Sequence, residues 1–157
     1  MHSKYSTAWV LAAFCILTCS SRASFAAVPT TDPCTLLAQA QVSAALGVDV
    51  APGQHVAKTA CQWSAVGPST PNAKKLTLTL QDPRAFAYAK MPVGHGVTKT
   101  PVSGIGDDAV SGTTPGLGTV LTVKKDNVVF VVHVFGFPTD EAEAKEKALA
   151  IQVLSKL

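Results

Sequence analysis

Alternation of apolar and polar positions dominates the second half of the chain. Over 75–81, Leu76, Leu78 and Leu80 fall on one side of an extended segment and threonines fall on the other, which predicts a half-buried β-strand. The segment 128–135 is apolar on both faces, so we expect a central strand covered on both sides. The period of two, or a short apolar run between turn residues, predicts up to six strands, at 60–66, 75–81, 97–102, 109–111, 119–124 and 128–135.

Helical spacing of apolar residues predicts helices on either side of these strands. The first covers 33–46, from a cap at Asp32 to an end at Gly47, and a break near Ala38 is left open. A second, short helix begins at Asp82. Helices, strands and hairpins in this order predict an α+β fold, in which an antiparallel sheet has helices packed on it.

The last predicted helix begins at Thr139, whose hydroxyl we expect to cap it. Two Glu–Lys pairs four residues apart support this helix, Glu141 with Lys145 and Glu143 with Lys147. Its predicted buried stripe consists of Ala142, Leu149, Val153 and Leu157, flanked by Ala150 and Leu154. We find no internal repeat and assign residues 27–157 to a single α+β domain.

The first 26 residues have the three parts of a secretory signal. Lys4 precedes an apolar run over 8–17, and small residues follow up to a cleavage site after Ala26. The run is shorter than the roughly 20 residues of a spanning helix, so we expect a periplasmic or secreted protein. The alternative is a membrane-anchored lipoprotein with its lipid on Cys19, because residues 16–19 resemble a lipobox, although Thr18 stands where such motifs carry Gly, Ala or Ser.

Removal of this signal changes the composition. The formal net charge of +3 falls to about +1, because loss of Lys4 and Arg22 leaves 11 basic residues against 10 acidic ones. Without a basic stripe, nucleic acid is not an expected partner. Two of the four cysteines remain, Cys34 and Cys61, and in an oxidising compartment this pair predicts a disulfide.

The segment 92–118 is rich in Gly and Pro and is our candidate binding surface, because long irregular loops in compact domains often carry function. Glycine spacing over 104–109 matches a dinucleotide fingerprint, but no strand–helix–strand unit surrounds it, so we interpret it as a tight turn. Asp107 and Asp108 are neighbours on an extended segment, so their carboxylates point in opposite directions and cannot share a metal ion without a special turn. The candidate binding residues are His95, Gly104, Gly106, Asp107 and Asp108.

The order of short motifs resembles that of a broad group of small exported bacterial proteins, many of them lipoproteins. The matching motifs are Asp32-Pro33-Cys34, Leu46-Gly47, Cys61-Gln62-Trp63 and Gly104-Ile105-Gly106-Asp107-Asp108-Ala109. Some members are similar to the extracellular sensor domains of mycobacterial receptor kinases. Over 32–157 the resemblance implies a PsbP/Mog1-like α/β sandwich with a Cys34–Cys61 bridge and no common enzymatic activity. It transfers no functional residues.

These observations predict an exported, non-enzymatic binding or interaction domain for a protein or small-molecule ligand in the cell envelope. One alternative is an envelope-associated, lipoprotein-like accessory factor, which would touch the membrane only through a lipid on Cys19. Another is a small hydrolase with a scattered site, such as Ser103, His133 and Asp108, although nothing in the sequence selects these three. We predict no catalytic residue, metal ion or cofactor.

Overall fold

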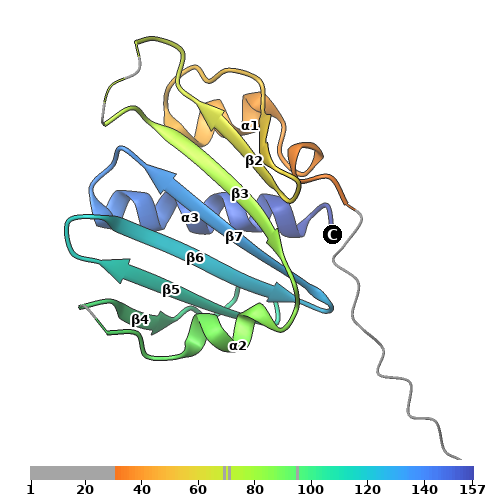
Figure 1. Ribbon diagram of the computed structural model, residues 1–157. Coiled ribbons are helices and arrows are strands. Elements are labelled where there is room, and N and C mark those ends of the chain that lie inside the picture. Colours follow the sequence, from red (N-terminus) through yellow and green to blue (C-terminus); the bar gives the residue numbers. More distant parts are fainter. Residues whose placement is uncertain (1–30, 69, 71, 95) are drawn as a thin grey trace, which may run out of the picture.

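The computed structural model describes residues 31–68, 70, 72–94 and 96–157 (Figure 1). The predicted signal segment, Cys19 and His95 lie outside the described residues. Among the helices of the described part, none is long and apolar enough to cross a membrane.

Seven antiparallel strands form one sheet in the order β1-β2-β3-β7-β6-β5-β4 (Figure 1). The strands are β1 (Gln54–Ala57), β2 (Ala60–Ser64), β3 (Lys75–Gln81), β4 (Thr98–Pro101), β5 (Asp108–Thr114), β6 (Gly118–Lys125) and β7 (Val128–Phe135). The predicted α+β fold with an antiparallel sheet is confirmed. The strands predicted within 92–118 are both present, because β4 and β5 lie wholly inside this segment, and β5 is longer than the predicted 109–111.

The first predicted helix is two elements. Asp32 caps a short 3₁₀ turn, η1 (Pro33–Thr35), by accepting a hydrogen bond from the Cys34 N–H at 2.8 Å. α1 (Gln39–Leu46) then begins after Ala38 and ends at Gly47 in the left-handed conformation, φ +65°. The break near Ala38 and the glycine end are therefore both observed, and Asp32 caps the 3₁₀ turn rather than α1.

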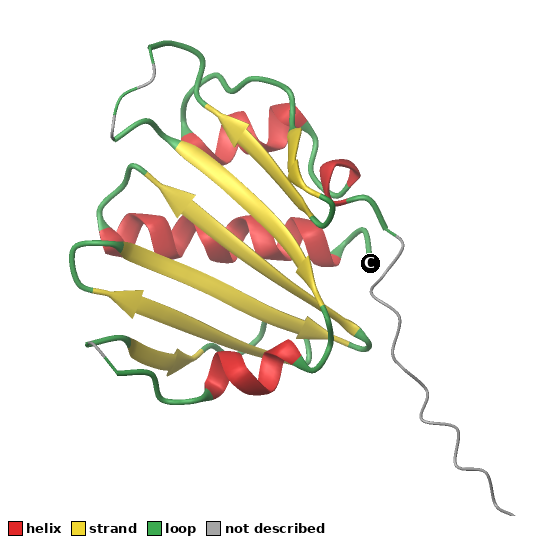
Figure 2. Ribbon diagram, viewed as in Figure 1, coloured by secondary structure: helices red, strands yellow, loops and turns green. Residues whose placement is uncertain are grey.

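Two further helices complete the fold, α2 (Ala85–Lys90) and α3 (Thr139–Leu154). α1 and α3 pack on one face of the sheet, and α2 lies on the other (Figure 2). The main core fills the space under α1 and α3, with Trp63, the β3 leucines and Phe130 at its centre. The Cys34–Cys61 disulfide joins η1 to β2 at this core, as predicted.

β7 is the central strand of the sheet, but the prediction that both of its faces are covered is wrong. Its inward side chains are packed under α3, whereas Val131, His133 and Phe135 on the outer face are only half-buried. α2 is too short to cover this face: it packs through Phe86 on Val110 and Val129 at one end of the sheet. No other helix of the described residues packs on the outer face, so the side chains beyond this end remain partly exposed.

α3 departs from the prediction at both ends and in the middle. The cap position is Pro138 rather than Thr139, and no side chain caps the helix. Leu157 follows the helix and is 43 % exposed, so it is not part of the buried stripe. Glu146, which we did not predict to be inside, is fully buried among the stripe residues. Both predicted Glu–Lys pairs are present, at 3.3 and 2.7 Å.

Candidate binding site

The neighbouring carboxylates of the predicted loop diverge, as expected from an extended backbone. Asp107 accepts hydrogen bonds from the Asp126 N–H at 2.6 Å and from the Lys125 ammonium at 3.0 Å. These bonds lower the pKa of Asp107, and the bond from Asp126 has the larger effect. Asp108 instead pairs with Lys90 of α2 at 2.6 Å. The two carboxylates therefore fasten the start of β5 to the β6–β7 turn and to α2.

The glycines of the same run also have structural tasks. Gly104 and Gly106 adopt φ values of +78° and +65°, which L side chains rarely adopt. A Cβ on Gly106 would lie 2.5 Å from the Lys124 carbonyl oxygen, whereas one on Gly104 would meet nothing within 4 Å. Gly106 thus permits a close approach of two backbones, as the tight-turn interpretation expects.

The scattered hydrolase site does not assemble. Asp108 lies opposite Lys124, and Lys124 lies opposite Val129. His133 is four residues further along β7, which at about 3.3 Å per residue separates it from the Asp108 end of the sheet by roughly 13 Å. Asp108 is also occupied by Lys90, so it does not orient a histidine.

The described residues contain one group with the spacing of metal ligands, formed by Asp32, Cys34 and His55. The Cys34 sulfur is part of the disulfide and has no thiolate to offer a metal ion. The remaining two side chains are about half exposed and pair with each other at 3.2 Å. Two such ligands do not make a structural metal site.

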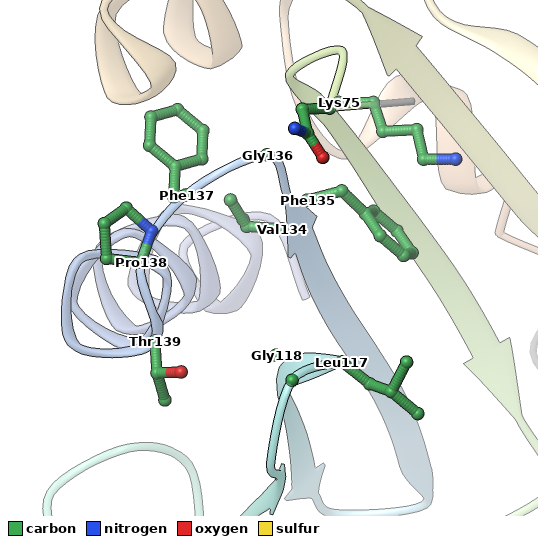
Figure 3. A pocket seen from close by; sticks show the side chains of 11 residues that line it. Lys75, Leu117, Gly118, Val134, Phe135, Gly136, Phe137, Pro138 and Thr139 are labelled. Carbon is green, nitrogen blue, oxygen red and sulfur yellow. The ribbon is translucent and has the colours of Figure 1, made fainter. Parts of the chain in front are cut away.

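A depression of the described surface lies where the β5–β6 turn meets the connection from β7 to α3 (Figure 3). Its volume is about 530 Å³. Both walls come from chain reversals: the glycine-rich turn on one side and the end of β7 on the other. The lining residues are Asn72, Lys75, Gly116, Leu117, Gly118, Val134, Phe135, Gly136, Phe137, Pro138 and Thr139.

Aromatic and cationic side chains gather around this depression. The Lys75 ammonium lies 4.4 Å from the centre of the Phe135 ring, and Lys74 and Lys145 lie 4.6 and 4.7 Å from the centre of the Phe137 ring. Such contacts hold the ammonium groups near the rings. No carboxylate is among the lining residues, so the surroundings are positive and partly apolar.

The open outer face of β7 continues from this depression. The His133 ring stacks on Phe135 with 3.6 Å between ring centres, and burial, with a smaller contribution from Lys75, lowers the pKa of His133. His133 is therefore neutral near pH 7. Leu117, at the tip of the β5–β6 turn, is 78 % exposed and projects beside the depression (Figure 3).

Beneath one wall of the depression lies Glu146. One of its carboxylate oxygens, Oε1, accepts a hydrogen bond from the Val134 N–H at 3.0 Å, and the other, Oε2, has no partner among the described residues. Burial raises the pKa of Glu146 to about 8, and the Val134 N–H and the nearby Thr119 hydroxyl offset this only in part. Its position, four residues after the buried Ala142, was the signal in the sequence.

Comparison with known proteins adds no relative: no family model, curated protein or solved structure matches the chain. The resemblance to exported bacterial proteins and to receptor-kinase sensor domains therefore stays an expectation from its motifs.

Proposed function

We propose that this chain is an exported, non-enzymatic binding domain, periplasmic or secreted, that holds its ligand at the depression between the β5–β6 turn and the β7–α3 connection. The secretory pattern of residues 1–26 supports export, and the Cys34–Cys61 disulfide is typical of an oxidising compartment. The separation of His133 from Asp108 supports binding rather than hydrolysis.

The observation that carries this proposal is the uncovered outer face of the sheet beside the depression. Phe135 is half-buried on that face, and Leu117 is almost wholly in solvent. Apolar side chains that remain exposed next to a concave surface are typical of binding sites. On the opposite face, α1 and α3 cover the core.

The proposed site differs from the binding surface predicted from the sequence. Of the segment 92–118, only residues 116–118 line the depression. Asp107 and Asp108, which we expected at the binding surface, are instead engaged with Lys125 and Lys90 at the other end of β5. The proposed site therefore combines the end of the predicted segment with the adjoining sheet and the start of α3.

The lining favours a ligand that is partly apolar and carries a negative charge. Leu117 and Phe135 provide apolar contact, and Lys75 provides a cation that has no ion-pair partner among the described residues. With no carboxylate in the lining, an anionic group would enter without repulsion from the walls.

Matched variants test this site. The full chain is expressed, the processed protein is immobilised and exposed to an envelope extract, and the retained material is quantified. We expect the double variant Leu117→Ser, Lys75→Ser to retain at least tenfold less material than the wild type. The apolar and the charged contact together should contribute about 1.4 kcal/mol or more to binding, which is a factor of ten in affinity. Tyr88→Ser and Ile151→Ser replace exposed apolar residues elsewhere and should retain it. Equal retention by all variants would exclude the depression as the site.

A further inference from the structure

The ladder between β6 and β7 stops early beside the depression. Pairing runs from Lys125 opposite Val128 to Leu121 opposite Val132. One more step of two residues would place Thr119 opposite Val134, but no such pair forms, and Figure 1 shows the two strands diverging toward the end of β7. The Val134 N–H, left without a strand partner, is bonded by Glu146 from α3.

The Glu146 carboxyl group therefore accepts the hydrogen bond from Val134 that a residue of β6 would otherwise accept. Its carboxyl group joins α3 to β7 where β6 has moved away, and β6 contributes the buried Thr119 hydroxyl, itself 3.0 Å from the Ser111 hydroxyl of β5. Val134 also lines the depression, as does Gly118, which begins β6. The carboxyl group is thus bonded to one wall of the proposed site, through Val134, and lies near the start of the other.

No cation faces Glu146 from any element packed around it in the described part of the chain. α1 carries no charged residue, and the inward side chains of β3, β5, β6 and β7 near α3 are apolar or hydroxyl groups. His133 and Lys75 are on the opposite face of the sheet. On α3 itself, Glu143 adds a like charge, and the lysines of the helix are paired with Glu141 and Glu143.

We propose that Glu146 is a protonation-controlled latch on the depression. As a neutral carboxyl group it keeps its bond to Val134, which holds the end of β7 against α3 beside the start of β6. As a carboxylate it is an unpaired buried charge, which is relieved when these strand ends open and water reaches it. Acidic surroundings therefore tighten the depression and more alkaline ones loosen it.

The latch is a property of the fold, and only its effect on a ligand rests on the proposed function. Its direction follows from proton linkage: the closed form binds the proton more tightly than the open form. The ratio of the open to the closed form should rise by up to about tenfold for each pH unit between roughly pH 5 and pH 8. Above about pH 8 this ratio should no longer change.

Amide hydrogen exchange of residues 27–157, followed by NMR without any ligand, tests the latch. The protection factor of the Val134 amide, corrected for the intrinsic pH dependence of exchange, should fall up to about 100-fold between about pH 5.5 and pH 7.5. It should also stay below that of Leu78, which lies in the middle of the sheet and whose amide we expect to exchange only through unfolding of the domain. Glu146→Gln keeps an oxygen for Val134 and should abolish this fall in protection toward alkaline pH.

Glu143→Gln is the matched control. It removes a neighbouring carboxylate, and the protection of the Val134 amide should still fall with pH almost as steeply as in the wild type. The latch would be overturned if Val134 protection depended on pH equally in the wild type and in Glu146→Gln. It would also be overturned if the Val134 amide were as well protected as the Leu78 amide. If Glu146→Gln does not fold, carbon NMR of the Glu146 carboxyl group in the wild type decides. A midpoint near 8 supports the latch, and one near the ordinary 4.5 contradicts it.

Discussion

The buried Glu146 makes the stability of this domain depend on pH in an unusual direction. The unfolded chain gives up this proton near pH 4.5, whereas the folded protein holds it to about pH 8. The stabilisation is complete below the lower value, is lost as pH rises between the two, and does not change further above the higher one. At 1.36 kcal/mol per pKa unit, the loss is up to roughly 5 kcal/mol, a large part of the 5–15 kcal/mol typical of a domain.

Replacement of Glu146 by glutamine isolates this effect. Gln keeps a carbonyl oxygen for the Val134 N–H and nearly the same volume, but it does not titrate. We expect the variant to lack the fall in the free energy of unfolding that Glu146 causes as pH rises, and to exceed the wild type by a few kcal/mol at the alkaline end. Urea unfolding can follow the fluorescence of Trp63, the only tryptophan of residues 27–157.

His133 makes the free energy of unfolding change with pH in the direction opposite to Glu146. The wild type and Glu146→Gln must therefore be compared at each pH. Its lowered pKa means that it is protonated more readily in the unfolded chain, which destabilises the fold as pH falls below about 6.5. His133 is present in both proteins, so its effect cancels in the difference. A difference that does not change from about pH 5 to pH 8 would refute the role assigned to Glu146.

Three further predictions concern other parts of the chain. Gly106→Ala should lower the free energy of unfolding by roughly 2–3 kcal/mol, because it adds a backbone clash to an unfavourable φ, whereas Gly104→Ala should cost about 1 kcal/mol; urea midpoints for both variants check this. Reduction of the Cys34–Cys61 disulfide, which closes a loop with a sequence separation of 27, should cost on the order of 3.6 kcal/mol, measured by unfolding with and without reductant. Mass spectrometry of the exported chain should show an N-terminus at residue 27, and a diacylglyceryl adduct on Cys19 would establish the lipoprotein alternative instead.

The sequence was informative where one local rule decides the structure. Alternating leucines at 76, 78 and 80 produced a strand with the expected faces, and Gly47 ended α1 because a left-handed residue was needed there. The disulfide was predicted from the expected oxidising compartment and the count of cysteines, and it is present. The same local rules placed Asp107 and Asp108 on opposite sides of the chain.

Features that depend on contacts between distant segments were missed. Thr139 could have capped α3, but Pro138 already occupies the cap position with an extended backbone. Glu146 has the helical spacing of a core residue, but its charge argued for the surface, and only the early end of the β6–β7 ladder explains a buried carboxyl group. The outer face of β7 is apolar, yet the length of α2 decides how much of it is covered.

The most direct test of the proposed binding site is site-specific photocrosslinking in the exported protein. A benzophenone amino acid is placed at Leu117 beside the depression or, as a control, at Ile151, which is 56 % exposed on α3. We predict a discrete adduct from position 117 that unlabelled residues 27–157 compete away, and none from position 151. Equal adducts from both positions, or none from position 117, would contradict a binding site at the depression.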